Sequence, residues 1–133
     1  MSTFDFSQFR SLVVEDNDFV RFMVKKYLTE YGFRHVDEAS NGQEGIQMLG
    51  RRPDIVICDI GMQPMNGFEF LKHVRAQSDG MARMPIIFLT SSADMDSVMK
   101  AVDLQVDAYL LKPVMPNVLK SKIVTLMTRL MTA

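Results

Sequence analysis

Carboxylates, a hydroxyl and a lysine directly follow short apolar segments at four places in the chain. Glu15 and Asp16 follow the first segment, Asp59 the second, Thr90 the third and Lys112 the fourth. If these segments are neighbouring parallel strands, the side chains meet at one edge of a sheet. Open sheets of this kind bind their ligands at that edge, where the strand order reverses.

Three carboxylates gathered at one edge would repel one another. Two unit charges about 4 Å apart cost roughly 4 kcal/mol at an effective dielectric constant of 20. Lys112 supplies one positive charge, and a divalent cation would supply the rest. Oxygen ligands without His or Cys beside them favour Mg²⁺, or Mn²⁺ as an alternative, over zinc. We therefore expect Mg²⁺ at this edge.

The same set of groups suits phosphoryl transfer. That reaction needs a nucleophile held in line, a metal ion, a cation and a hydroxyl or N–H donor. Asp59 can attack, which would yield an acyl phosphate, and Asp16 with the ion can position the phosphoryl group. Lys112 and Thr90 can neutralise charge and donate a hydrogen bond.

Four apolar runs and one weaker segment predict the strands that position these groups. The runs are continuous and rich in β-branched or aromatic residues, which is typical of parallel strands covered on both faces. They occupy residues 12–14, 55–58, 86–89 and 108–111. Residues 35–39 are weaker, as expected of a strand at the sheet edge.

Segments of helical periodicity separate the strands. The first helix is expected between Asp18 and Gly32, with large apolar side chains sharing one face. These side chains are Phe19, Phe22, Met23, Tyr27 and Tyr31. Further helices are expected near Asn41, Gly67, Asp94 and Pro116.

This alternation predicts an α/β fold, in which a doubly wound, five-stranded parallel sheet carries helices on both faces. The flavodoxin-like order 2-1-3-4-5 is one of the two common orders for such sheets. It places the first and third strands side by side, so that Asp16 and Asp59 would face each other.

The composition is that of one ordinary globular domain. The chain has 133 residues, of which 47% are hydrophobic and 23% charged. Fifteen basic and sixteen acidic residues give a net charge of -1, which argues against direct binding of nucleic acid. The lack of a long apolar run and the single cysteine, Cys58, lead us to expect a cytoplasmic protein that does not enter the membrane.

In combination, these motifs resemble one family. They are similar to the receiver domain of two-component response regulators, in its single-domain, chemotaxis-regulator-like form. The motifs are Glu15-Asp16, Asp59, the turn Met65-Asn66-Gly67, Thr90-Ser91, Tyr109 and Lys112-Pro113. The resemblance covers residues 9–131 as the receiver domain and leaves residues 1–8 as an N-terminal extension.

The resemblance implies a phosphorelay function centred on Asp59, which would accept a phosphoryl group from a phosphohistidine. The donor would be a sensor histidine kinase or a histidine phosphotransfer protein. Asp16, Asp59 and the backbone carbonyl of Gly61 would bind Mg²⁺ directly, and Glu15 would act through a metal-bound water. Lys112 would contact the phosphoryl group.

The resemblance also implies a conformational switch. The Thr90 hydroxyl would move toward the phosphoryl group while Tyr109 rotates inward. This would remodel the face formed by the fourth helix, fifth strand and fifth helix, to which a downstream protein would bind. A cis peptide before Pro113 would aim Lys112 into the site. Only self-phosphorylation and autodephosphorylation are implied, so the chain would not be an enzyme that turns over a separate substrate.

Other readings of the chain have weaker support. A phosphatase of the haloacid-dehalogenase type would need a second carboxylate two residues after the nucleophile, where Gly61 stands. A nucleotide-binding module would need a glycine fingerprint, which does not occur. The remaining alternative is a non-phosphorylated, receiver-like module that only binds proteins. Such a module would have lost the phosphoryl acceptor, the metal-binding carboxylates or the lysine, and this chain has all of them.

Overall fold

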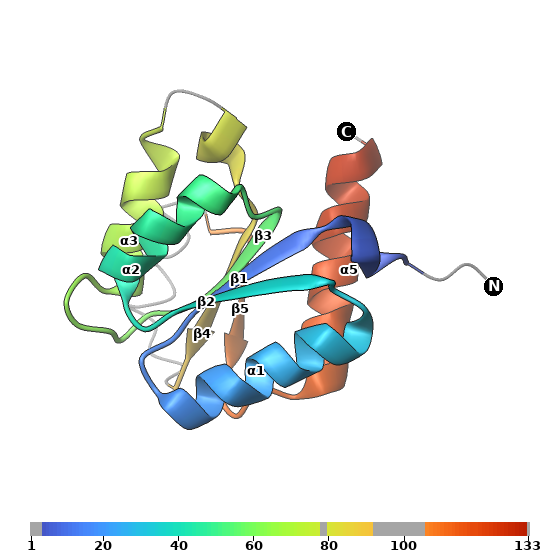
Figure 1. Ribbon diagram of the computed structural model, residues 1–133, viewed down its shortest axis with the longest axis horizontal. Coiled ribbons are helices and arrows are strands. Elements are labelled where there is room, and N and C mark those ends of the chain that lie inside the picture. The colour runs from blue at the N-terminus through green and yellow to red at the C-terminus, as the bar shows by residue number, and fades with distance from the viewer. Residues whose placement is uncertain (1–3, 78–79, 92–105, 133) are drawn as a thin grey trace.

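Five parallel strands in the order β2-β1-β3-β4-β5 form the centre of the protein (Figure 1). The computed structural model describes residues 4–77, 80–91 and 106–132. The strands are β1 (Arg10–Val14), β2 (His35–Ala39), β3 (Ile55–Asp59), β4 (Ile86–Thr90) and β5 (Ala108–Leu111). The predicted fold class and strand order are confirmed.

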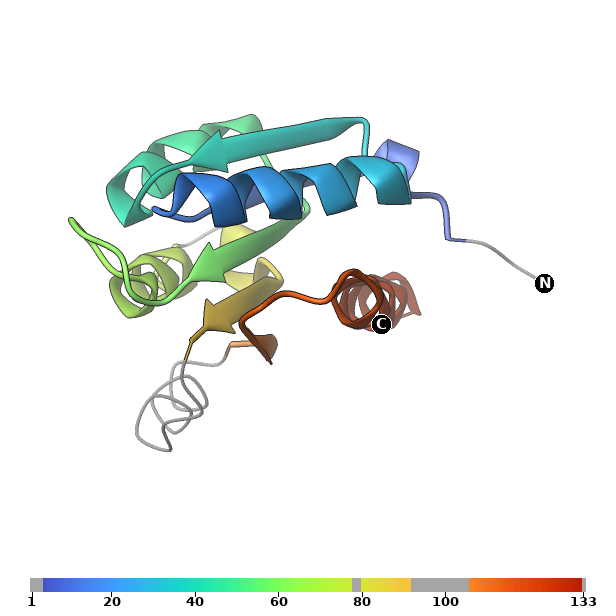
Figure 2. The same cartoon turned by 90° about the horizontal axis from the view of Figure 1, so that it is seen from below.

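Helices cover both faces of this sheet, as Figure 2 shows from below. They are α1 (Asp18–Tyr31), α2 (Gly42–Met48), α3 (Gly67–Arg75) and α5 (Pro116–Thr132). The 3₁₀ turns are η1 (Phe6–Gln8), η2 (Leu49–Arg51) and η3 (Gly80–Arg83). The helix expected from Asp94 lies outside the described residues.

Each strand of the sheet centre contributes side chains to two hydrophobic cores, because successive residues of a strand point to opposite faces. In β1, Val13 packs into the core beneath α1 and α5, whereas Leu12 and Val14 pack into the core beneath α3. All five residues of β3 and all five of β4 are buried. The continuous apolar runs in the sequence therefore reflect strands covered on both faces.

The helix ends follow local sequence signals. Asn17 caps α1 by accepting a hydrogen bond from the Val20 N–H, and Gly32 ends the helix with a φ of 114°. The turn before α3 forms a capping box, in which the side chains of Asn66 and Glu69 each accept from the other's backbone N–H. These signals fix where each helix starts relative to the preceding strand.

The apolar face predicted for α1 is only partly the face that packs on the sheet. Val24 and Leu28 are buried, with Tyr27 packed against the same core. Phe19 and Phe22 remain 71% and 61% exposed. A helix lying on a sheet buries the stripe that faces the sheet, and these two rings stand outside that stripe.

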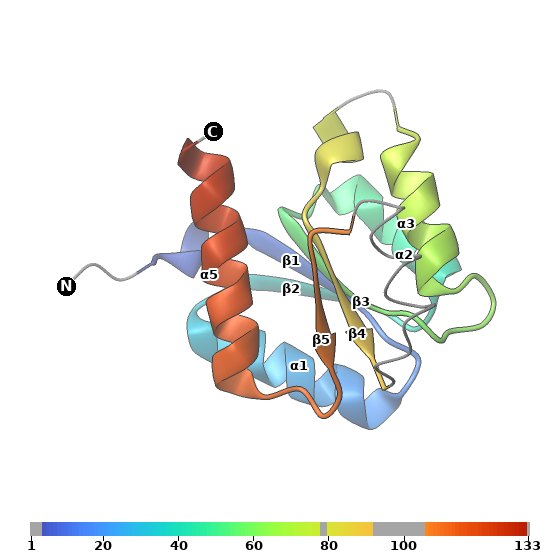
Figure 3. The same ribbon diagram turned by 180° about the vertical axis from the view of Figure 1, so that it is seen from behind.

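Residues 4–9 pack beside α1 and α5 (Figure 3). Phe6 is 2% exposed and lies 5.0 Å, centroid to centroid, from Phe33 and 6.0 Å from Tyr31. The Tyr31 hydroxyl donates to the backbone carbonyl of Pro116, which links the end of α1 to the start of α5. The assignment of residues 1–8 as an extension outside the domain stays a prediction.

Candidate acidic site at the carboxyl edge of the sheet

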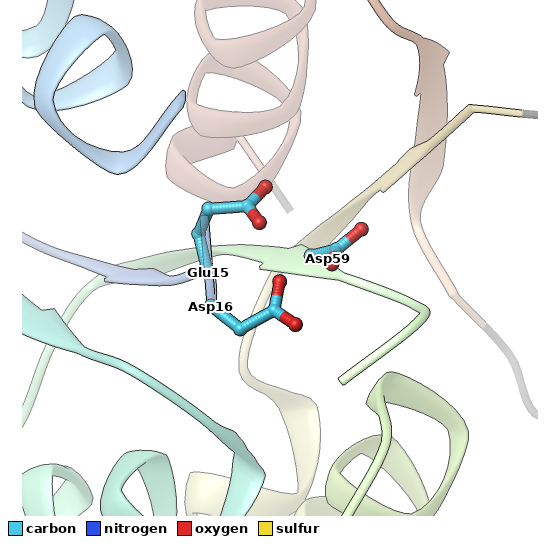
Figure 4. A group of neighbouring side chains, drawn as sticks. All are labelled: Glu15, Asp16 and Asp59. Atoms are coloured by element: carbon cyan, nitrogen blue, oxygen red, sulfur yellow. The ribbon is translucent and has the colours of Figure 1, made fainter. Parts of the chain in front are cut away.

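Three carboxylates from two neighbouring strands meet at the carboxyl edge of the sheet (Figure 4). Glu15 and Asp16 follow β1, and Asp59 is the last residue of β3, which pairs directly with β1. One oxygen from each of these side chains lies within 4.8 Å of the others. The expectation that distant acidic residues converge here is confirmed.

The site opens to solvent through a cavity of about 390 Å³. Asp59 is 6% exposed at its wall, whereas Asp16 is exposed. The lining residues are Asp16, Asn17, Asp59, Ile60, Gly61, Thr90, Ser91 and Lys112. A small group can therefore reach Asp59 from solvent without any movement of the core.

Lys112 reaches this site from the residue after β5. Its Nζ lies 2.9 Å from Glu15 Oε1 and 3.2 Å from Asp59 Oδ1. Its backbone N–H donates to the carbonyl of Thr90 at 2.7 Å, and the predicted cis peptide before Pro113 is present. The lysine thus bridges carboxylates from two different strands.

Burial dominates the electrostatics of Glu15, which is fully buried. Loss of hydration raises the pKa of its carboxyl to about 7, although hydrogen bonds from Lys112 and from the Asn17 N–H oppose this shift. Burial alone would lower the pKa of Lys112, but the carboxylates of Glu15 and Asp59 raise it overall. The lysine therefore carries its charge at neutral pH.

Each carboxylate oxygen of Glu15 has a charged or polar protein group beside it. Oε1 pairs with Lys112, and Oε2 accepts from the Asn17 N–H at 3.1 Å. Sequence reasoning assigned Glu15 to the metal and missed its contact with the lysine. The feature of the sequence that could have indicated this contact was the residue type, because a glutamate side chain is one methylene longer than an aspartate side chain.

Gly67 was given no role in the site by the sequence analysis. A Cβ at this position would lie 2.5 Å from the carbonyl oxygen of Asp59 and 2.8 Å from Ile60 Cα. The Gly67 N–H donates to the Ile60 carbonyl at 2.9 Å. Close approach of α3 to the backbone beneath Asp59 thus requires glycine at its first residue.

The other sequence-predicted residues divide into two groups. Gly61, Thr90 and Lys112 line the cavity together with Asp59. Tyr109 does not; it is 43% exposed and lines a separate groove of about 600 Å³ along β5 and the start of α5. The structure therefore separates the residues of this cavity from the tyrosine that was predicted to act with them.

The donor set fits a hard divalent cation. It consists of carboxylate oxygens, and the cavity lining contains neither histidine nor cysteine. Asp16 is the most available ligand, because within the described part of the chain no hydrogen bond or ion pair involves its carboxylate.

Cys58, one residue before Asp59, is buried, and burial raises the pKa of its thiol well above the usual value.

A parallel sheet in this order is the fold shared with solved receiver proteins. Residues 11–124 match the family model of the response regulator receiver domain, and the chain belongs to that family. Receiver domains transmit phosphorelay signals, and the family uses Mg²⁺ at its acidic site.

Chemotaxis proteins are among the relatives of this chain. It is 38% identical over 114 residues to a chemotaxis protein CheY homolog of Campylobacter jejuni, covering 84% of this chain and 87% of the relative. It is 31% identical over 120 residues to chemotaxis protein CheY-3 of Vibrio cholerae, covering 90% and 92%. The solved structure of Vibrio cholerae CheY4 superposes with a TM-score of 0.77 at 30% identity, covering 90% of this chain and 96% of that one. The chain is thus a CheY-like receiver.

None of the helices in the described part of the chain combines the length and the apolar character needed to cross a membrane.

Proposed function

We propose that Asp59 accepts a phosphoryl group from a phosphohistidine on a sensor histidine kinase or a histidine phosphotransfer protein. The observation that carries this proposal is the position of Asp59, at the wall of an open cavity beside two further carboxylates and Lys112. One Asp59 oxygen forms the bond to phosphorus while the bond between phosphorus and the histidine nitrogen breaks. The product is an acyl phosphate on this chain.

Asp16, Asp59 and the Gly61 carbonyl would hold the Mg²⁺, and Glu15 would act on it through water. The indirect role of Glu15 is supported by the ion pair of its Oε1 with Lys112 and by the hydrogen bond of its Oε2 with the Asn17 N–H. When bound, the ion neutralises charge on the transferring phosphoryl group. Without the positive charge of the ion, the approach of a phosphoryl group to three carboxylates would be strongly unfavourable. Mn²⁺ satisfies the same oxygen donors.

Lys112 and Thr90 would complete the phosphoryl site. Lys112 already lies 3.2 Å from Asp59 Oδ1, so its ammonium can pair with a phosphoryl oxygen attached there. Thr90 ends β4 beside Asp59 at the end of β3, and it lines the same cavity. Its hydroxyl would donate to the phosphoryl group.

The output would be a change in the groove along β5 and α5. Tyr109 on β5 pairs in register with Phe88 on β4, two residues before Thr90. Movement of Thr90 toward the phosphoryl group would let Tyr109 turn inward, which shifts a two-state equilibrium of this face. A downstream protein that prefers one state would then bind the face of helix 4, strand 5 and helix 5 with an affinity that depends on phosphorylation.

The chain would act as a switch, with self-phosphorylation and autodephosphorylation as its only chemistry. We place this exchange in the cytoplasm, in line with the free thiol of Cys58. Direct contact with nucleic acid is not part of the proposal, because the net charge of -1 offers no basic footprint.

Incubation with acetyl phosphate and Mg²⁺, followed by intact-protein mass spectrometry, tests the proposal. We expect one added phosphoryl group on the unaltered chain and none on Asp59→Asn. Beryllofluoride with Mg²⁺ should shift the amide NMR signals around Asp59 and Thr90 in the unaltered chain only. Modification that persists in Asp59→Asn would show that another residue is the acceptor. An unmodified wild-type chain would favour the non-phosphorylated, protein-binding module.

A further inference from the structure

The Asp16 carboxylate belongs to the acidic cluster without polar contacts of its own in the described part of the chain. Asp16 is exposed, and within residues 4–77, 80–91 and 106–132 its carboxylate has no hydrogen bond or ion pair. It nevertheless lies with Glu15 and Asp59 in a cluster of oxygens within 4.8 Å of one another (Figure 4). The peptide before Asp16 sets the direction of its Cα–Cβ bond, from which the carboxylate reaches the cluster.

Hydrogen bonds restrain the backbone on both sides of Glu15. The Glu15 N–H donates to the Ala39 carbonyl on β2 at 3.0 Å. The Glu15 carbonyl, which shares its peptide plane with the Asp16 N–H, accepts from Arg21 Nη1 at 2.9 Å. Arg21 is thus the side chain that grips the peptide between the two acidic residues.

The position of Arg21 on α1 explains how it reaches back to β1. Side chains on a helix lean toward its N-terminus, and Arg21 lies in the first turn after the Asn17 cap. Its backbone N–H donates to the Asn17 carbonyl at 2.9 Å, which closes that first turn. The guanidinium therefore returns to the strand that precedes its own helix.

Further contacts hold the guanidinium in this orientation. Nη2 lies 2.7 Å from Asp18 Oδ1, and Nε lies 3.5 Å from Glu38 Oε1 on β2. The Arg21 side chain is only 17% exposed as a result. A planar fork of donors can serve acceptors on three elements at once, which the single nitrogen of a lysine cannot do.

We propose that Arg21 is a positioning residue of the acidic site, and that its hydrogen bond to the Glu15 carbonyl holds Asp16 in place toward Asp59. This deepens the proposed function, on which its metal-binding consequence rests. The hydrogen bond itself exists without metal and is independent of any phosphoryl donor. Loss of the bond frees the Glu15–Asp16 peptide to rotate, so the cluster loses the preorganisation that a cation would otherwise meet.

Two readouts on the full chain test this role. The first is the ¹³C chemical shift of the Glu15 carbonyl in metal-free protein, which reports whether that carbonyl accepts a hydrogen bond. The second is Mn²⁺ affinity, measured by electron paramagnetic resonance. The test variant is Arg21→Met, which keeps the apolar stem and removes every donor. The matched control is the double variant Asp18→Ala/Glu38→Gln, which removes both ionic partners of Arg21 and leaves its bond to Glu15.

We expect Arg21→Met to move the Glu15 carbonyl signal upfield and to weaken Mn²⁺ binding about tenfold. The double variant should keep the carbonyl signal and bind Mn²⁺ within about twofold of wild type. The inference is overturned if Arg21→Met keeps the wild-type carbonyl signal and affinity. It is also overturned if the double variant keeps the wild-type carbonyl signal and still loses as much affinity as Arg21→Met, because the charge network would then be responsible.

If Arg21→Met does not fold, Arg21→Lys is measured in its place. The Glu15 carbonyl signal and the Mn²⁺ affinity of this variant should change together, in the direction expected for Arg21→Met. A loss of Mn²⁺ affinity with an unmoved carbonyl signal overturns the inference. Wild-type protein that binds no Mn²⁺ would contradict the metal site of the proposed function. The carbonyl signal, which needs no metal, would still decide whether Arg21 holds the peptide.

Discussion

Lys112 Nζ lies 2.9 Å from Glu15 Oε1 and slightly further, 3.2 Å, from Asp59 Oδ1. A single ammonium group therefore bridges two carboxylates that follow β1 and end β3. Both carboxylates are buried, so each would be costly without a cationic partner. In metal-free protein, this lysine is the main offset to the acidic charge of the site.

Removal of the lysine should destabilise the metal-free protein at a pH where both carboxylates are ionised. We expect Lys112→Ala to lower the free energy of unfolding by roughly 2 kcal/mol at pH 8 in EDTA, as measured by urea denaturation. Lys25→Ala is the matched control, because its ion pair with Glu38 at 3.0 Å lies on the surface. That variant should lose less than about 1 kcal/mol. Equal losses of unfolding free energy in the two variants would mean that the buried ion pairs of Lys112 stabilise the protein no more than a surface ion pair does.

The stability of metal-free protein should fall as pH rises from about 4.5 to about 7. Burial raises the pKa of Glu15 from 4.5 to about 7 in the folded state, so the folded protein keeps a proton that the unfolded chain releases. Stability decreases wherever the folded state binds more protons, by up to about 3 kcal/mol for this group. Urea denaturation in EDTA between pH 5 and 8 measures this fall.

Glu15→Gln is the control for that pH dependence. The variant has no titrating carboxyl at this position, so the difference between the two stability curves isolates Glu15. Parallel curves for wild type and Glu15→Gln would contradict the assignment of this pH dependence to Glu15.

An added methyl group at Gly67 should disturb both stability and phosphorylation. The new Cβ would meet the Asp59 carbonyl oxygen at 2.5 Å, and the backbone there must shift to relieve the overlap. We expect Gly67→Ala to cost about 1–3 kcal/mol of unfolding free energy and to slow labelling by acetyl phosphate. Gly50→Ala is the control, because a Cβ at Gly50 meets nothing within 4 Å. Wild-type labelling kinetics in Gly67→Ala would contradict the role given to this close approach.

The hydroxyl of Tyr31 should stabilise the contact between α1 and α5. It donates to the Pro116 carbonyl, and burial raises the pKa of this phenol to about 12. We expect Tyr31→Phe to lower the free energy of unfolding by about 1 kcal/mol. Tyr27→Phe on the same helix is the control, because the described residues provide no hydrogen bond to the Tyr27 hydroxyl. Equal effects of the two variants on thermal or urea denaturation would argue against this link.

Phe6 should contribute as much to stability as a residue of the central core. Its ring is 2% exposed and packs with the side chains of α1 and α5. Phe6→Ala should therefore cost about 3–5 kcal/mol, whereas Phe19→Ala, at 71% exposure, should change stability by about 0.5 kcal/mol or less. A small loss in Phe6→Ala would contradict the core role given to the Phe6 ring.

Much of the fold and part of the site could be predicted from sequence. Continuous apolar runs such as residues 55–58 identify strands buried on both faces, and cap residues such as Asn17 and Gly32 mark the helix ends. The acidic cluster followed from the rule that parallel strands present their carboxyl ends at one edge. Periodicity misjudged Phe19 and Phe22, because it does not show which stripe of a helix faces the sheet.

The amino-acid sequence by itself determined the residue types, their place at the strand ends and the strand–helix alternation, because these depend on local propensity and on burial patterns along the chain. Only the tertiary structure decided that Lys112 pairs with Glu15, that Arg21 holds the Glu15 carbonyl and that Gly67 packs against Asp59. Such contacts depend on side-chain reach and on packing distances between elements. These quantities are set by how strands and helices come together in space, and no local pattern of residues encodes them.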